Sequence, residues 1–228
     1  MNIIAIDCGA SFIKATKFKE GQIVNTIVMK TPVDSDNEKL EKSVKIIWEI
    51  IEQLSIGLDE VHIGFSNEMH GFVLTNQQGV PVLPYISWQK ELGDLEECRS
   101  LFGLELIETT GMPLKLGLPS TNLYYLIQNG QIELDEPLYF YTLGDYYIRV
   151  ITGQQPYIHA TNAAATGLYN IFEKKWIPEL ISRIIGDEKQ KLLIFSSIYW
   201  GQKEICIEKN KTKFLFYPAL GDQQAALL

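Results

Sequence analysis

The stretch IDCGASFIK at residues 6–14 combines residue types that suit a phosphate site. Asp7 ends a β-branched run, and a glycine, a hydroxyl side chain and a lysine follow it. Glycine lets a backbone approach a phosphate closely, and the N–H groups of such a hairpin, the Ser11 hydroxyl and Lys14 can bind its oxygens. Asp7 can hold Mg²⁺, because this ion prefers one or two carboxylates plus phosphate oxygens. The alternative is a glycine turn capped by the aspartate, with Lys14 merely exposed. The pattern is not a P-loop, which requires GxxxxGK[ST] before a helix.

Two further polar stretches each follow a predicted strand. SNEMHG at residues 66–71 comes directly after VHIGFS, and open α/β sheets usually bind ligands at the carboxyl ends of their strands. His70 can exchange a hydrogen bond with a substrate hydroxyl, or it can be a buried histidine bonded to backbone. Trp88 can stack on the apolar face of a sugar or polyol while Gln89 bonds a hydroxyl. The alternative for Trp88 is a tryptophan packed in the core.

Asp222 lies one residue past a glycine in GDQQAALL at residues 221–228. It follows a buried-looking strand and precedes a run of alanines and leucines, so its side chain can cap a helix. It can also be a general base, which accepts a hydroxyl proton while the oxygen attacks a phosphoryl group. The sequence has no Ser-His-Asp order or GxSxG elbow, so acyl transfer has little support. Neither His62 nor His159 has a carboxylate or cysteine at metal-ligand spacing.

The elements that must position these residues form an α/β pattern. Residues 38–54 place apolar side chains at helical spacing with charges opposite, which predicts an amphipathic helix. Strands, then this helix, then a strand indicate a mixed sheet. The pattern of residues 72–88 predicts two short strands. We find no tandem repeat or linker and expect one domain. The other predicted strands span 2–7, 12–18, 22–30, 61–66, 191–197 and 213–220, and the other predicted helices span 118–128 and 143–151.

The composition is that of an ordinary globular protein. Apolar residues make up 46% and charged residues 21% of 228 residues, and a net charge of −8 argues against a nucleic-acid partner. The three cysteines show no CxxC spacing, so we expect reduced thiols. The N-terminus lacks the basic region of a signal peptide, and no apolar stretch approaches the ~20 residues of a membrane helix. We therefore expect a cytoplasmic protein with no membrane partner.

Taken in order, the stretches resemble the N-terminal half of the FGGY carbohydrate kinases, a family that includes glycerol kinase, xylulokinase and gluconokinase. The resemblance runs in register over essentially all of the chain, and GDQQAAL is its most specific piece. The stretches that carry it are IDCGASFIK, SNEMHG, YISWQKE, TTGMPLKLGLPSTNLYYL, LGDYYIRVITG, HATNAAATGLYN and GDQQAAL.

This resemblance implies an actin-like (ribonuclease H-like) α/β fold with a mixed five-stranded sheet flanked by helices. It implies that residues 1–228 are the sugar-binding N-terminal domain, and that ATP binds between it and a C-terminal ATP-binding domain that this chain lacks. The implied activity is ATP- and Mg²⁺-dependent phosphorylation of a sugar, sugar acid or polyol hydroxyl. Carried over residue by residue, the roles are Asp222 as catalytic base, Asp7 for Mg²⁺, Gly9, Ser11 and Lys14 for the ATP phosphates, and Met69, His70, Trp88, Gln89 and Gln223 for the substrate.

Several positions depart from the family pattern. Ala10 stands where the family usually has threonine, Lys90-Glu91 follow where an arginine or an Asn-Asp-x-Arg run is more usual, and Asn122 replaces a lysine. These departures leave the sugar unnamed. A non-catalytic carbohydrate-binding or regulatory protein derived from a sugar kinase is the alternative. A chain that lacks a domain would also expose apolar surface, so a homodimer or association with the C-terminal domain is expected.

Overall fold

The computed structural model describes residues 1–33, 36–201 and 203–227. The chain divides into two compact units, each assembled from separate stretches. Unit 1 consists of Met1–Glu68, Leu143–His159 and Tyr199–Leu228, and unit 2 consists of Met69–Thr142 and Ala160–Ile198. The chain therefore passes from one unit to the other several times, and no linker-like composition marks these points.

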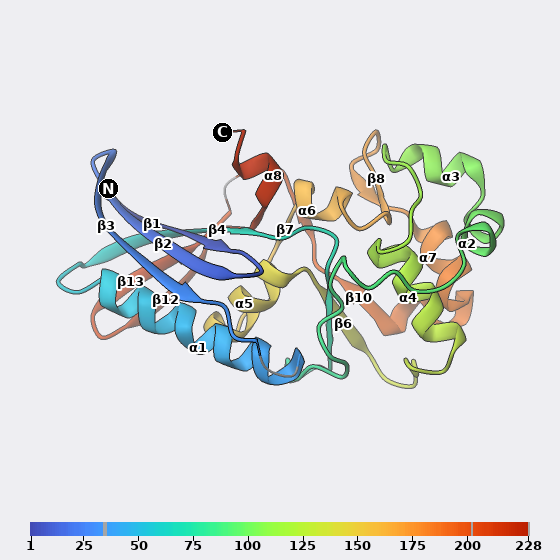
Figure 1. The fold of residues 1–228 in the computed structure, drawn as a ribbon, viewed down its shortest axis with the longest axis horizontal. Coiled ribbons are helices and arrows are strands. Elements are labelled where there is room, and N and C mark those ends of the chain that lie inside the picture. The colour runs from blue at the N-terminus through green and yellow to red at the C-terminus, as the bar shows by residue number, and fades with distance from the viewer. Residues whose placement is uncertain (34–35, 202, 228) are drawn as a thin grey trace. The chain divides into compact units, whose positions relative to one another are not determined.

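A mixed sheet forms the centre of unit 1 (Figure 1). Its strand order is β12-β13-β4-β1-β2-β3, and β14 also pairs with β4. The strands predicted at 2–7, 12–18 and 22–30 are confirmed, and they form a meander in which β1 and β3 pair antiparallel with β2. Strands β1, β13 and β14 run parallel to β4. The strands are β1 (Asn2–Cys8), β2 (Phe12–Lys19), β3 (Gln22–Lys30), β4 (Glu60–Asn67), β12 (Ile205–Lys209), β13 (Thr212–Phe216) and β14 (Leu220–Gly221).

The expected mixed sheet flanked by helices is confirmed, but the number of strands differs. Within the described residues it has seven strands instead of five. The stretch predicted as one strand at 213–220 is split into β13 and β14 by an irregular segment. The additional strand β12, which was not predicted, forms an antiparallel hairpin with β13.

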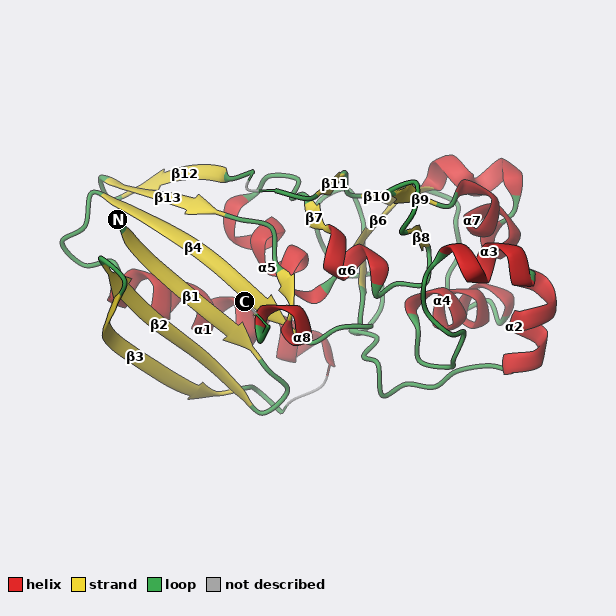
Figure 2. Cartoon of the chain, turned by 90° about the horizontal axis from the view of Figure 1, so that it is seen from above, coloured by secondary structure: helices red, strands yellow, loops and turns green. Residues whose placement is uncertain are grey.

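Two helices of unit 1 cover one face of this sheet. Figure 2 shows α1 (Asp36–Leu54) and α5 (Leu143–Thr152) behind the strands and α8 (Asp222–Ala225) in front of them, near the strand ends. The predicted amphipathic helix is confirmed as α1, which buries Leu40, Ile47 and Ile51. Alternate residues of β1, such as Ile4 and Ile6, are buried as well. The open face therefore carries the other set of alternate residues.

Unit 2 packs helices around a three-stranded sheet of order β10-β6-β5. Its core includes the stacked rings of Phe72 and Phe140, whose centroids lie 5.2 Å apart. The predicted helix at 118–128 is confirmed as α4, whereas the stretch 191–197 begins as a 3₁₀ turn before it becomes β10. The elements are β5 (Val73–Thr75), α2 (Leu95–Phe102), α3 (Leu104–Thr109), α4 (Pro119–Gln128), β6 (Leu138–Tyr141), α6 (Ala160–Ala164), β8 (Tyr169–Asn170), β9 (Lys175–Trp176), α7 (Pro178–Ile185), η1 (Asp187–Leu192) and β10 (Leu193–Phe195).

Two short strands, β7 (Ile158–His159) and β11 (Ile198–Tyr199), lie where the chain passes between the units. Among the helices in the described part of the chain, none is both long and apolar enough to cross a bilayer.

Candidate functional site

The stretch IDCGASFIK forms the tight connection between β1 and β2 in unit 1. The Gly9 N–H donates to the carbonyl oxygen of Phe12 at 3.1 Å, and Asp7 lies opposite Lys14 across the two strands. A Cβ atom on Gly9 would lie 3.2 Å from that same oxygen, so glycine keeps the turn tight. The predicted hairpin is thus present, with Ser11 and Lys14 exposed.

Thr31, which sequence reasoning missed, braces this hairpin. Its hydroxyl donates to the Gly9 carbonyl at 2.8 Å, and its N–H donates to the Ser11 carbonyl at 3.0 Å. Thr31 is 6% exposed, so its own side of both bonds is shielded from water. Two carbonyl oxygens of the turn therefore point toward Thr31, so they do not repel an anion bound at the tip of the hairpin. Thr31 is distant in sequence from the turn, and no local motif announces this contact.

The carboxyl ends of three parallel strands bring the two candidate carboxylates to one edge of the sheet. Ser66 on β4 pairs with Asp7 on β1 and with Leu220 on β14. The Ser66 hydroxyl donates to Asp7 Oδ1 at 2.9 Å, which fixes the orientation of that carboxylate. Asp222 follows β14 directly as the first residue of α8. This is the edge at which open α/β sheets bind ligands.

Asp222 is exposed, and its local geometry is that of a residue in the first turn of a helix. The N-cap is Gly221, whose position bears no capping side chain. The carboxylate of Asp222 instead accepts the N–H of Gln223 at 2.8 Å. An acidic group at this end of a helix is electrostatically favourable. Because Asp222 and Gln223 are both exposed, the carboxylate can also contact a substrate.

Gly144, at the start of α5, packs tightly beneath the segment that leads to Asp222. A Cβ atom at this position would lie 2.4 Å from the Ala219 Cβ and 2.5 Å from Asn67 Oδ1. Ala219 and Asn67 are both buried. Only glycine allows α5 to approach the ends of β4 and β14 this closely. The sequence contained this residue in LGDYY, but nothing local indicated its partners.

Cys8, next to Asp7, has no role as a nucleophile. Burial and then the charge of Asp7 raise the pKa of its thiol well above the usual range. The group therefore stays protonated and packs as a small apolar side chain.

A separate group of candidate residues lies in unit 2. His70 has a left-handed backbone with φ of 63°, and its Nδ1 lies 2.8 Å from the Ala165 carbonyl oxygen. A carbonyl accepts only, so Nδ1 carries the proton in this bond. The prediction of a histidine bonded to backbone is confirmed, although His70 is half-buried. The backbone N–H and carbonyl groups of Phe72 and Ile86 bond each other in both directions, which joins the chain just after His70 to the chain just before Trp88.

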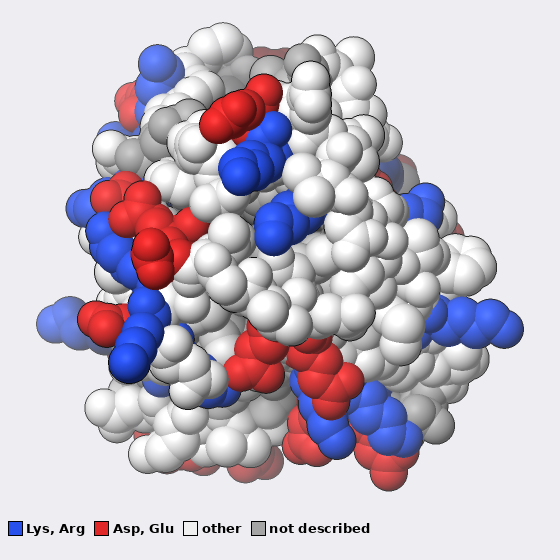
Figure 3. Space-filling model, turned by 90° about the vertical axis from the view of Figure 1, so that its left-hand side faces the viewer, with Lys and Arg blue, Asp and Glu red and all other residues white. Residues whose placement is uncertain are grey.

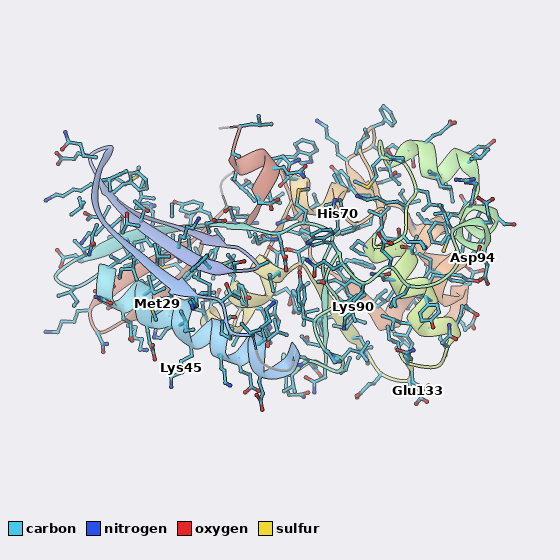
Figure 4. All side chains as sticks on the ribbon, viewed as in Figure 1. Met29, Lys45, His70, Lys90, Asp94 and Glu133 are labelled. Carbon is cyan, nitrogen blue, oxygen red and sulfur yellow. The ribbon has the colours of Figure 1, made fainter. Side chains whose placement is uncertain are left out.

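Trp88 is 48% exposed, so the interpretation as a packed core tryptophan is wrong. It lies in a turn with Gln89, which is also exposed. Met69 is half-buried at the start of the unit. Figure 4 labels three residues of this unit. His70 lies in the loop after β4, Lys90 follows Gln89 in the chain, and Asp94 is the N-cap of α2.

Asn122, a departure from the family pattern, holds the loop that follows Trp88. Its side chain is fully buried on α4. The amide nitrogen donates to the Lys90 carbonyl at 2.7 Å, and the amide oxygen accepts the Leu92 N–H at 3.2 Å. The loop carrying Trp88 and Gln89 is therefore attached to a helix of the core.

Unit 1 also has a pocket of about 890 Å³ on the open face of its sheet. It extends from Met1 and Ile3 along β1 to Asp7, and its lining is largely apolar. At its polar rim, the Tyr217 hydroxyl and His62 Nδ1 lie 2.8 Å apart. Burial raises the pKa of Tyr217. Figure 3 shows one end of unit 1, where charged side chains of both signs lie among uncharged surface.

The residues present fit a magnesium ion that arrives with a nucleotide. The described residues contain no group of three or more His, Cys, Asp and Glu side chains that could hold a metal ion by themselves. Asp7 offers a single carboxylate, oriented by Ser66. One carboxylate suits Mg²⁺, which keeps several waters and takes phosphate oxygens as its remaining ligands.

The fold is the actin-like α/β fold found in sugar kinases of known structure. Glycerol kinase from Plasmodium falciparum, solved with ADP, superposes with a TM-score of 0.79 at 18% identity over 99% of this chain and 49% of that chain. Xylulose kinase from Rhodospirillum rubrum gives a TM-score of 0.79 at 14% identity over 100% of this chain and 51% of that chain.

The sequence matches the N-terminal domain of the FGGY family of carbohydrate kinases over residues 2–228. The chain belongs to this family. Among its relatives, xylulose kinase from Staphylococcus xylosus is 26% identical over 80% of this chain and 40% of its own length. Glycerol kinase from Coxiella burnetii is 27% identical over 98% of this chain and 49% of its own length. The chain thus spans about half the length of the relatives it matches.

Proposed function

We propose that this chain is the sugar-binding half of a cytoplasmic, ATP-dependent kinase that phosphorylates a hydroxyl of a sugar, sugar acid or polyol. One observation carries the proposal. The paired register of β1, β4 and β14 brings Asp7 and Asp222 to the same edge of the sheet, next to the β1–β2 hairpin. A carboxylate for the acceptor hydroxyl and a phosphate-binding turn are the two parts that phosphoryl transfer requires from this half.

In this proposal Asp222 accepts the proton of the attacking hydroxyl as the oxygen approaches the phosphoryl group. The Gln223 N–H bonds one oxygen of the carboxylate, and the side chain is exposed, so a substrate hydroxyl can reach it. The N–H groups of the hairpin, the Ser11 hydroxyl and Lys14 bind the phosphate oxygens, and Thr31 keeps the carbonyls of the turn away from them. Asp7, oriented by Ser66, would hold Mg²⁺. When bound, the ion neutralises charge on the phosphate oxygens.

The sugar side of the proposal rests on unit 2. The indole of Trp88 offers an apolar face for stacking, and Gln89 offers an amide for a hydroxyl. His70 contributes its Nε2 atom to a substrate hydroxyl, which can donate or accept, while its Nδ1 donates to Ala165. Met69 and Gln223 are the remaining substrate contacts that the family resemblance implies.

We further propose that a C-terminal ATP-binding domain completes the enzyme. The relatives are about twice as long as this chain. The apolar pocket on the open face of unit 1 is the surface that we expect the second domain to cover, because its lining is largely apolar and open to solvent. Domain closure would then exclude water and align the phosphates of ATP with the hydroxyl.

The test uses the full-length protein. We would screen pentuloses, hexoses, polyols and sugar acids for ATP-dependent ADP release, and then repeat the best substrate with Asp222→Asn. Loss of a general base should lower kcat by roughly 10²- to 10⁴-fold with little change in the KM for sugar. Asp94→Asn, at the N-cap of α2, is a matched carboxylate control. Undiminished turnover by Asp222→Asn would remove the proposed base.

A second candidate is a carbohydrate-binding or regulatory protein that has lost catalysis. The substitutions at Ala10 and Asn122 favour it, because they remove a hydroxyl and a cation from the family pattern. Calorimetry with the same sugars distinguishes the two candidates. Saturable sugar binding by a full-length protein that releases no ADP with any sugar would favour this second function.

A further inference from the structure

We propose that Asn122 is a positioning residue for sugar recognition. Its side chain fixes the backbone at residues 90–92 and thereby sets where Trp88 and Gln89 meet the substrate. This inference rests on the proposed function, because it takes these two exposed residues as sugar contacts.

The buried amide of Asn122 binds two backbone groups that flank one residue. It donates to the Lys90 carbonyl at 2.7 Å and accepts the Leu92 N–H at 3.2 Å. An amide side chain has both a donor and an acceptor, so it can satisfy both groups at once. Asn122 is 0% exposed, which means that water cannot replace it in either bond without opening the packing between loop and helix.

The clamped backbone is continuous with the turn that carries the sugar contacts. We call residues 87–90 the Trp88 turn. Within it the Lys90 N–H donates to the Ser87 carbonyl at 3.0 Å, and the Gln89 N–H donates to the Ser87 hydroxyl at 3.3 Å. Lys90 is therefore shared between the turn and the Asn122 clamp. A displacement of Lys90 moves Trp88 and Gln89 with it.

A second contact limits how the Trp88 turn can move. A Cβ atom at Gly117, where φ is 85°, would lie 2.6 Å from the carbonyl oxygen of Trp88. The loop before α4 thus lies directly against the backbone of Trp88. The bonds from Asn122 and the close contact with Gly117 leave the backbone of the turn little freedom, while Trp88 remains 48% exposed. A rigid backbone beneath an accessible side chain is the arrangement expected of a binding residue.

Sugar kinetics of the full-length enzyme test the proposal. In Asn122→Ala, the KM for sugar should rise by roughly 10- to 100-fold, because a displacement of about 1 Å in a binding group has effects of this size. The KM for ATP should stay within about twofold. Asn122→Ser keeps a smaller neutral donor and acceptor at this position, so its KM for sugar should be intermediate. If Asn122→Ala does not fold, the second variant tests the positioning role in its place.

Asn129→Ala is the matched control. Asn129 caps the C-terminus of the same helix, and its side chain donates to the Tyr125 carbonyl at 2.9 Å on an exposed surface. Its KM for sugar should stay within about twofold of the wild type. A KM for sugar that is unchanged in Asn122→Ala, or raised equally for ATP and sugar, would overturn the positioning role.

Amide hydrogen exchange separates this proposal from the proposed function. Asn122→Ala should speed exchange in residues 87–92, whereas Asn129→Ala should not. If the wild-type enzyme phosphorylates no sugar, the proposed function fails, yet faster exchange together with weaker sugar binding in calorimetry would still support Asn122 as a positioning residue. Unchanged exchange in Asn122→Ala would overturn it whether or not the enzyme is active.

Discussion

Replacing Gly144 with alanine tests whether the close approach of α5 sets the position of the candidate base. The added Cβ would lie 2.4 Å from the Ala219 Cβ and 2.5 Å from Asn67 Oδ1. To restore an ordinary contact of 3.4 Å, Ala219 or α5 must move by about 1.0 Å. Ala219 is 0% exposed and lies just before Asp222, so the movement passes into the segment that carries the base.

The expected magnitudes follow from this overlap. Overpacking of a buried site costs about 1–3 kcal/mol of unfolding free energy, which lowers the Tm of a chain this long by about 2–12 °C. A shift of about 1 Å at the base should lower kcat by roughly 100-fold. The KM for sugar should change much less, because the added methyl belongs to unit 1, whereas Trp88 and its turn belong to unit 2.

The assay combines differential scanning calorimetry of the purified chain with steady-state kinetics of the full-length enzyme. The double variant Gly144→Ala/Ala219→Gly removes the nearer clashing atom and leaves the contact with Asn67. It should therefore recover part of the lost Tm and of the lost kcat, once the effect of Ala219→Gly alone is subtracted. Gly144→Ala with a wild-type Tm and a wild-type kcat would refute the reasoning, and so would a double variant no better than the single one.

Three further predictions concern the hairpin and the thiols. Thr31→Val removes the hydroxyl bond to Gly9, so the KM for ATP of the full-length enzyme should rise by roughly 2- to 12-fold; an unchanged KM would contradict the bracing role. Cys206 is exposed and should react with Ellman's reagent in the native chain, whereas buried Cys8 and Cys98 should react only in denaturant, and rapid labelling of all of them would contradict their burial. Burial raises the pKa of Cys98 from 9.0 to about 11, so the unfolded chain loses this proton first. In urea unfolding, the contribution of Cys98 to the free energy of unfolding should be constant below pH ~9. The free energy of unfolding should then fall between pH ~9 and ~11, and Cys98→Ala should reduce that fall.

The parts of the fold that local patterns encode could be predicted from the sequence. The meander of β1, β2 and β3 and the amphipathic helix α1 follow from period-two and helical spacing, and each was placed within a few residues. The β1–β2 hairpin and the position of Asp222 after a strand also follow from local residue types. Strand β12 could not be found in this way, because it has only a three-residue apolar run before two charged residues, and its pairing with β13 defines it as a strand.

The residues that hold the site in place depend on contacts between distant parts of the chain. Thr31 braces Gly9, Gly144 contacts Ala219, and Asn122 clamps Lys90. Each is an ordinary residue type in its local sequence, and only the tertiary structure defines its partner. The exposure of Trp88 belongs to the same class, since a tryptophan in an apolar stretch reads equally well as core. Family motifs indicate which residues meet the substrate, whereas tertiary packing indicates which residues support them.

The pairing of β4 has a consequence for the order in which the chain folds. One edge of β4 pairs with β1, close to the N-terminus, whereas the other edge pairs with β13, and Lys213 and Glu60 across that pair are 153 residues apart. All of unit 2 is synthesised after β4 and before β13. During translation the outer edge of β4 therefore stays without β13 until nearly the whole chain has emerged. Unit 2 can fold first, and unit 1 closes its sheet last, so β4 is the strand most exposed to mispairing on the ribosome.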